Sequence, residues 1–340
     1  MKVRSIFAGL IASFALLLTS ERSLQADPEF SLNFGTVAPD GTPWSAQLQG
    51  IKKRIEKESD GRVQVKLFLG GSLGSEIEMI QDVQKGERLQ GGGFSTGAVG
   101  EALDIGVLKM VELPFLFRSN SEADKVLDTV LLEPTKTALA EKGITFYAWS
   151  ENGWRNFATK GPASTPEALT SFKMRSQESD VHLNMYKSMG VQAVAKPVSE
   201  VVPSLNTGIV TGFDNTPLFS LAAGWIQPVS HYTLSRHIYQ PAAVFYSKTF
   251  VDRLPAELQG ILMANANEES ISGRATVRAM EGELIETIKA MGKDVAELSP
   301  EQRKAFVKAC RKNTHTAFLA ANPEMQSTYE KVMTTLKGMR

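Results

Sequence analysis

Apolar residues along this chain switch repeatedly between the period of a strand and the period of a helix, and this alternation restricts the fold most. Residues 30–37 alternate apolar and polar side chains, as a strand does. Residues 43–59, 75–85 and 121–142 repeat their apolar positions at helical spacing, and Ser121 is the expected N-cap of the last of these helices. Strands that alternate with helices predict an α/β fold with largely parallel sheets.

The length of the chain, 340 residues, exceeds what one hydrophobic core usually supports, so two domains are expected. No linker rich in proline, serine or glycine separates two consecutive domains, and this favours interleaved lobes. We predict that lobe I comprises residues 27–152 plus 241–280, and that lobe II comprises residues 153–240 plus 281–340.

A long helix is expected to cross both lobes. The sequence after Pro255 stays compatible with a helix to about Met291 without a further proline, and such a helix would reach about 50 Å. Gly260, Gly273 and Gly282 leave a kink or a break equally open.

The N-terminus has the pattern of a secretory signal peptide. Lys2 and Arg4 precede an apolar run at residues 6–18, and a polar stretch follows as far as Ala26. The run is shorter than the ~20 residues of a membrane-spanning helix, so we predict cleavage after Ala26 and export of residues 27–340 to the periplasm. The formal net charge is zero, and this gives no electrostatic basis for binding nucleic acid.

The motifs of enzymes and cofactor-binding proteins are mostly missing. Residues 93–97 match the G-x-S-x-G pattern of a serine hydrolase, but the polar, glycine-rich residues before them favour a turn over a buried strand, and a periplasmic hydrolase using Ser95 is the weaker alternative. No glycine-rich phosphate loop or dinucleotide fingerprint is present, so no cofactor is expected. The histidines lack the spacing and the companions of a metal site: His182, His231, His237 and His315.

Two arginines stand among apolar and aromatic residues on predicted strands. Arg155 follows Trp154, and Arg175 ends the strand at 172–175. A guanidinium remains charged when it is desolvated and can hold a carboxylate through two parallel hydrogen bonds. Either arginine alone could be a surface or ion-paired side chain, but together they indicate a site for an organic anion.

Several short motifs, taken in order, resemble the solute-binding component of tripartite ATP-independent periplasmic (TRAP) transporters. Each motif is weak by itself, whereas their order and spacing make the set specific. They are GRV at 61–63, GGSLGSE at 70–76, LPFLFRS at 113–119, ENGWR at 151–155, TPEAL at 165–169, FKMR at 172–175, SEV at 199–201 and NTP at 215–217.

The resemblance implies a two-lobed periplasmic binding protein with hinge strands, which captures a small organic acid for integral membrane subunits driven by an ion gradient. In that family the arginine at the position of Arg175 forms a bidentate salt bridge with the ligand carboxylate. Arg155, with an acid and a histidine that fall on Asp214 and His237, implies a buried polar network beside the ligand. Asn215 corresponds to a usual hydrogen-bond partner of the ligand.

Two departures from the family pattern qualify these expectations. The acid before Asn215 is an aspartate, one methylene shorter than usual, so its contact with Arg155 is expected to need a backbone adjustment or a water molecule. Residues 91–97, where relatives that bind sialic acid carry charged side chains, contain no charge. We therefore expect a compact carboxylate with an apolar body in preference to a polyhydroxylated sugar acid.

Further ligand contacts are expected from side chains near these motifs. Trp44, Phe94 and Phe213 could line the cleft, although buried aromatic residues more often fill a core, and Glu178 could contact a ligand hydroxyl or amine, although it could equally be a solvated acid at a helix N-terminus. A receptor for an ATP-driven importer, or a sensor that presents ligand to a membrane kinase, would use the same cleft with another partner.

Overall fold

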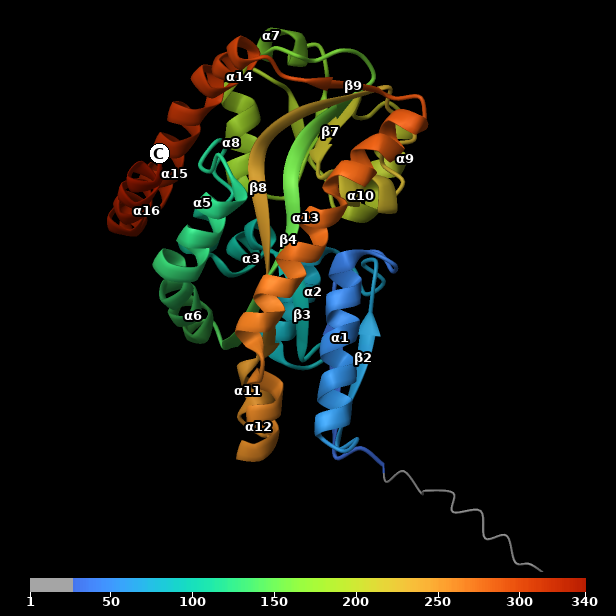
Figure 1. The fold of residues 1–340 in the computed structure, drawn as a ribbon, viewed down its shortest axis with the longest axis vertical. Helices are drawn as coiled ribbons and strands as arrows, with labels where there is room; N and C mark the ends of the chain where they lie inside the picture. Colours follow the sequence, from blue (N-terminus) through green and yellow to red (C-terminus); the bar gives the residue numbers. More distant parts are fainter. Residues whose placement is uncertain (1–26) are drawn as a thin grey trace, which may run out of the picture.

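The computed structural model describes residues 27–340, and the predicted signal peptide at 1–26 lies outside the described residues. Strands and helices alternate as expected, so the α/β class is confirmed (Figure 1). The strands are β1 Phe30–Gly35, β2 Val63–Phe68, β3 Gly91–Ser95, β4 Ile144–Thr159, β5 Met174–Ser176, β6 Ala193–Ala195, β7 Gly212–Asn215, β8 His231–Ser247 and β9 Asp294–Glu297.

Two long antiparallel strands, β4 and β8, form the centre of the sheet and are shared by its two sides. The strand order is β2-β1-β3-β8-β4-β7-β5-β6, and β9 pairs with β8. On one side β3 pairs with the 242–246 half of β8, and on the other β7 pairs with the 156–159 half of β4. Five of the eight strand pairings are parallel, as predicted. We call these groups the β1–β3 side and the β5–β7 side.

The helices pack on the two faces of the sheet and build separate cores around it. Two segments have π-helical geometry, η1 and η3, and two are short 3-10 turns, η2 and η4. The helical segments are α1 Pro43–Glu58, α2 Glu76–Lys85, α3 Thr96–Leu103, α4 Gly106–Met110, α5 Asn120–Lys125, η1 Val126–Leu131, α6 Leu132–Glu141, α7 Pro166–Leu169, α8 Asp180–Ser188, η2 Val198–Glu200, α9 Val201–Asn206, α10 Pro217–Ala222, α11 Lys248–Val251, α12 Ala256–Met263, α13 Ala266–Ala290, α14 Pro300–Phe306, η3 Val307–Arg311, α15 Lys312–Ala321, η4 Pro323–Met325 and α16 Gln326–Met339.

The long helix predicted after Pro255 is divided into α12 and α13. The division falls at Asn265, which has a left-handed φ of 60°, and none of the three glycines breaks the helix. Asparagine tolerates this backbone region because its short polar side chain can hydrogen-bond locally. The remaining 25 residues of α13 run across β4 and contact both α1 and α10 (Figure 1). Helix α13 thus bridges the two sides, as expected of the long helix.

The helix predicted at 121–142 begins earlier than expected. Its N-cap is Ser119, whose side chain accepts a hydrogen bond from the backbone of Glu122, so the prediction of Ser121 was wrong. Ser121 lies inside α5. An acid stands three residues after each serine, Glu122 after Ser119 and Asp124 after Ser121. The sequence pattern of an N-cap therefore fits both serines, and only the backbone geometry shows which one is the cap. The boundaries of the two lobes, 27–152 plus 241–280 and 153–240 plus 281–340, remain a prediction.

Candidate functional site

A narrow cavity of about 20 Å³ lies between the two sides of the sheet. Its floor is formed by β4 and β8, and residues from both sides close around it. The apolar lining residues are Val37, Trp44, Val198, Phe219 and Trp225, and the polar ones are Glu76, Ser95, Asn152, Arg155, Arg175, Gln177, Asn215 and Gln240. The polar lining offers many hydrogen-bonding groups to a small ligand, and the two sides must separate to admit one.

Arg175 is a buried guanidinium without a counter-ion. It lies in β5, only 3% exposed, and no carboxylate among residues 27–340 approaches it within salt-bridge distance. Its Nε and Nη2 atoms donate to the backbone oxygen of Lys196 at 2.9 and 2.6 Å, and its guanidinium lies 4.9 Å from the ring centre of Trp225. Burial, together with repulsion from Arg155, lowers the pKa of Arg175 to about 10. The group is therefore still charged at neutral pH, and a buried unpaired charge is unfavourable until an anion reaches it.

Arg155, by contrast, is fully compensated. Its Nε donates to Oδ2 of Asp214 at 2.6 Å and its Nη2 to the backbone oxygen of Asp214 at 2.5 Å. The shorter acid therefore reaches Arg155 directly, without the bridging water that was one of the two expected alternatives. Burial opposes ionisation of Asp214, but the charge of Arg155 and the hydrogen bond with His237 outweigh it and hold the pKa of Asp214 well below its usual range.

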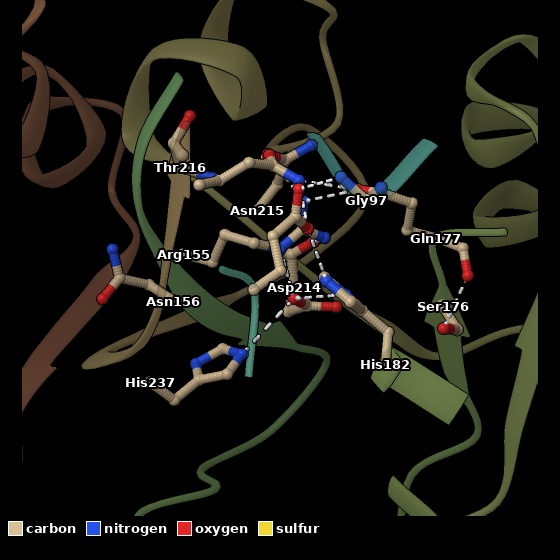
Figure 2. Close-up of polar contacts among 12 residues, drawn as sticks. Gly97, Arg155, Asn156, Ser176, Gln177, His182, Asp214, Asn215, Thr216 and His237 are labelled. Atoms are coloured by element: carbon tan, nitrogen blue, oxygen red, sulfur yellow. Dashed lines mark hydrogen bonds and ion pairs between the residues drawn. The ribbon is translucent and has the colours of Figure 1, made fainter. Parts of the chain in front are cut away.

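His237 lies behind this pair and away from the cavity. Its Nε2 is 3.3 Å from Oδ2 of Asp214, its Nδ1 is 2.8 Å from Oγ of Ser235, and its ring stacks on Phe157 at 4.0 Å (Figure 2). Burial lowers the pKa of His237 to about 4, so the imidazole is neutral at pH 7. A neutral ring that donates to Asp214 must accept the hydrogen bond from Ser235. Asp214 and His237 thus form the predicted network, but they do not line the cavity.

The network continues across the cavity to the β1–β3 side through residues that the sequence did not single out. His182 in α8 contacts Glu112 at 2.8 Å, and Gln240 donates to the same carboxylate at 3.0 Å. Burial opposes ionisation of Glu112, but its contact with His182 lowers the pKa of the carboxyl below its usual value. Gln177 also crosses between the sides, donating to Ser95 at 3.3 Å. The cavity is therefore held closed by a continuous polar network (Figure 2).

Glu76 brings an ionisable carboxyl group to the cavity from the β1–β3 side. Its two carboxylate oxygens accept hydrogen bonds from the backbone nitrogen and the hydroxyl of Ser95, at 2.7 and 3.0 Å. Burial raises the pKa of Glu76 to about 7, although the hydrogen bonds from Ser95 oppose this shift. Residues 91–97 are uncharged, as noted, and the ionisable group that lines the cavity from this side comes from α2, which the sequence analysis did not single out.

Ser95 does not lie in the predicted turn. Residues Gly91–Ser95 form the buried strand β3, and α3 follows it immediately, so the prediction of a turn was wrong. The glycines fit a buried strand because neighbouring groups leave no room for side chains: a Cβ on Gly92 would lie 2.4 Å from the backbone oxygen of Gly35. The hydroxyl of Ser95 is bonded to Glu76 and Gln177, and no histidine contacts it within residues 27–340. The geometry lacks the histidine base of a serine hydrolase.

Three hydrogen-bonded amide side chains form a polar wall of the cavity. Asn152 donates to Asn215 at 3.2 Å and to Gln240 at 2.7 Å. The side-chain oxygen of Asn215 also accepts from the backbone of Thr216 at 2.8 Å, while its amide nitrogen has no partner within residues 27–340. Asn215 therefore lines the cavity with a free donor, consistent with the role that the resemblance implied.

The structure separates the remaining predicted contacts. Trp44 lines the cavity, and its buried Nε1 has no hydrogen-bond partner among the described residues. Phe94 and Phe213 are fully buried in the core and do not line it. Glu178 is half-buried outside the cavity, where burial raises its pKa and the charge of Arg175 opposes the shift.

The sequence carried signals for two of the residues that were missed. Gln177 is two positions after Arg175 in the chain, and residues two apart on an extended backbone point to the same side. Glu76 directly follows the helix-capping Ser75 within the GGSLGSE motif. Trp225 and Phe219 had no such signal, because they reach the cavity from α10 and the loop that follows it.

A sheet divided between two sides, two long strands shared by both, and an enclosed cavity with an unpaired guanidinium define a receptor of the two-lobed solute-binding class. Comparison with known proteins identifies its family. Residues 34–320 match the family model described as bacterial extracellular solute-binding protein, family 7, and the chain belongs to this family.

Individual relatives agree with this assignment. The chain is 27% identical to the 2,3-diketo-L-gulonate-binding periplasmic protein of Escherichia coli K12, over 95% of this chain and 96% of that protein. It is 30% identical to a TRAP periplasmic solute-binding protein of Citrobacter koseri with bound D-glucuronate, with a TM-score of 0.81 over 89% of this chain and 98% of the other. A galacturonate-bound protein of Sulfitobacter sp. NAS-14.1 gives 27% identity and a TM-score of 0.83 over 88% and 97%. The predicted TRAP-type solute-binding function, with an organic acid as ligand, is confirmed at the level of the family.

Proposed function

We propose that the protein captures a monocarboxylic sugar acid, such as a uronate or an aldonate, and that Arg175 binds its carboxylate. The unpaired, buried guanidinium of Arg175 is the observation that supports this most directly. A ligand carboxylate would supply the missing counter-charge, and the planar guanidinium can bind both of its oxygens.

The rest of the cavity favours hydroxyl groups over an apolar body. Glu76 offers acceptor oxygens, Asn215 offers a free amide donor and Trp44 a free indole donor. Eight of its thirteen lining residues are polar, so a wholly apolar ligand body would leave several buried groups without partners. The earlier preference for a compact acid with an apolar body is therefore replaced, and the uronates and the diketogulonate named for the relatives point the same way.

The proposal is tested by calorimetry with D-glucuronate and D-galacturonate against two controls. D-glucose has the hydroxyls without the carboxylate, and butyrate has the carboxylate without the hydroxyls. We expect saturable binding of at least one uronate and at least about a hundredfold weaker binding of both controls, since each lacks one half of the required contacts. Glucose binding as tightly as the uronates would overturn the role of Arg175, and butyrate binding as tightly would overturn the role of the polar wall.

We also propose that residues 1–26 direct export and are removed, and that the protein is a receptor without catalytic activity. Members of the family are periplasmic, as the name of the E. coli relative states. Within residues 27–340 no helix combines the length and apolar character needed to cross a membrane. N-terminal sequencing of the periplasmic form tests the cleavage after Ala26. Ester hydrolysis by the wild type that disappears in Ser95→Ala would contradict the receptor assignment.

The lobes are proposed to close around the ligand as rigid bodies, with the predicted boundaries. The bonds from Gln177 to Ser95 and from His182 to Glu112 join the two sides, so opening must break them. The alternative partners, an ATP-driven importer or a sensor kinase, find no support in relatives named as TRAP proteins. Small-angle scattering with and without the uronate should show contraction on binding.

A further inference from the structure

A second cavity, of about 510 Å³, lies on the opposite face of the β4–β8 ribbon from the ligand cavity. Consecutive residues of a strand point to opposite faces, and the two cavities divide them accordingly. Arg155 lines the ligand cavity while Trp154 lines the second one, and His237 belongs to the buried network while Arg236 lines the second cavity. The two spaces are therefore separate, with the ribbon between them.

The second cavity is strongly cationic. Five guanidinium groups line it, from a loop, from β8, from α14, from η3 and from Arg340, against a single acidic side chain. They belong to Arg118, Arg236, Arg303, Arg311 and Arg340, and the acidic side chain belongs to Glu281.

Most of this charge has no counter-ion. Arg340 is paired with Glu122 at 2.9 Å, and Arg236 approaches Glu281 at 3.6 Å. Within residues 27–340, Arg118, Arg303 and Arg311 form no ion pair. Burial and then repulsion from Arg236 and Arg118 lower the pKa of Arg303. The arginines therefore repel one another, and an anion between them would relieve the repulsion.

Backbone contacts hold two of these side chains in place around an aromatic wall. Arg303 donates from Nη1 to the backbone oxygen of Ser235 at 2.8 Å and lies 5.3 Å from the ring centre of Phe115. Arg311 donates to the backbone oxygen of Phe115 at 3.2 Å. Both guanidiniums are oriented before any ligand arrives, which lowers the entropy loss on binding.

The strand itself is distorted so that Arg236 reaches the cavity. The pairing of β4 with β8 shifts between Arg155↔Ile238 and Phe157↔Thr233, so four residues of β8 bulge out opposite Asn156. The side-chain oxygen of Asn156 accepts from the backbone of Arg236 at 3.0 Å, and Arg236 has a left-handed φ of 41°. Phe115 across the cavity is left-handed too, with a φ of 53°. Bulges and left-handed non-glycine residues are unfavourable and concentrate at functional sites, where they direct a side chain.

From these observations we infer a second binding site on this face, for a small anion that carries two or more negative charges, such as a pyrophosphate, a phosphate ester or a tricarboxylate. The site is concave and is built from five separate segments, which suits a small molecule better than the flat face of a protein partner. Its chemistry is that of several guanidiniums around a polyanion, with the aromatic wall limiting access of water.

The test is calorimetry of the mature protein with pyrophosphate and with citrate, at low ionic strength, where exposed charges are least screened. We expect one saturable site, a roughly tenfold loss of affinity in Arg236→Gln, and a larger loss in the double variant with Arg303→Gln. Arg253→Gln is the matched control, because it removes the same charge from an exposed arginine elsewhere. This control, and Arg175→Gln in the ligand cavity, should bind the probes like the wild type.

Three outcomes would overturn the inference. They are the absence of saturable binding in the wild type, an equal loss in Arg253→Gln, and loss in Arg175→Gln alone, which would place the probe in the ligand cavity. Binding of a pentaglutamate peptide without binding of pyrophosphate would likewise replace the small anion with a protein partner. Arg236 is exposed, so its variant should fold, and circular dichroism of each variant verifies this. Failure of the uronate experiments would leave these results unaffected.

Discussion

Replacing the two cavity arginines by methionine, one at a time, should separate an arginine that stabilises the fold from one that binds the ligand. Methionine fills a similar volume without charge. In Arg155→Met the carboxylate of Asp214 stays buried without its ion pair, and breaking such a pair lowers the free energy of unfolding by about 3–5 kcal/mol. In Arg175→Met no carboxylate is left behind. The two hydrogen bonds to the backbone of Lys196 and the contact with the ring of Trp225 are lost, and removal of an unpaired buried charge offsets them, so we expect a decrease of no more than about 1 kcal/mol without ligand.

Ligand affinity, in contrast to stability, should fall strongly in Arg175→Met. Loss of a buried charged contact to a carboxylate weakens binding by about 2–5 kcal/mol, or roughly 30- to 4000-fold in Kd. Urea unfolding of both variants without ligand, and calorimetry with the uronate that binds the wild type, measure the two effects. If Arg175→Met lost as much stability as Arg155→Met, or bound the uronate like the wild type, the distinction between a paired and an unpaired arginine would be refuted.

Two further predictions concern the β1–β3 side. The raised pKa of Glu76 means that the folded state holds this proton more tightly than the unfolded chain, so stability should fall by about 3 kcal/mol as pH rises from about 4.5 to about 7. In Glu76→Gln, urea unfolding should show a free energy of unfolding that no longer falls by this amount over the same pH range. If the variant and the wild type had the same pH dependence, the role of Glu76 would be contradicted. Gly97→Ala would place a Cβ 2.7 Å from Oε2 of Glu112, and should lower stability by about 1–3 kcal/mol. Gly50→Ala, inside α1, is the control: its added Cβ meets open space, so the change should raise stability by about 0.5–1 kcal/mol. If Gly97→Ala and Gly50→Ala shifted the melting temperature in the same direction, the packing argument would be contradicted.

The class of fold could be predicted from the sequence because it depends on local periodicity. The helical spacing of apolar positions in α1 and the strand-like alternation in β1 are set by neighbouring residues. The break at Asn265 and the start of α5 at Ser119 could not be predicted, because several nearby residues offered equivalent signals. Strand β3 was missed for another reason: its glycines are required by the close approach of Gly35 and other neighbours from distant parts of the chain.

The sequence by itself determined which side chains could form an anion site: the motif ending in Arg175, the pair Arg155 and Asp214, and Asn215. The resemblance already implied that Arg175 is the free arginine, but only the tertiary structure shows the contacts that leave it free. Both are buried guanidiniums on strands, but Asp214, 59 residues from Arg155 in the chain, lies against Arg155 and leaves Arg175 with backbone oxygen alone. Coulomb interactions depend on distance in space and on desolvation, which the order of residues does not reveal. For the same reason the carboxyl group of Glu76 in the cavity became apparent only when α2 was seen to pack beside β3.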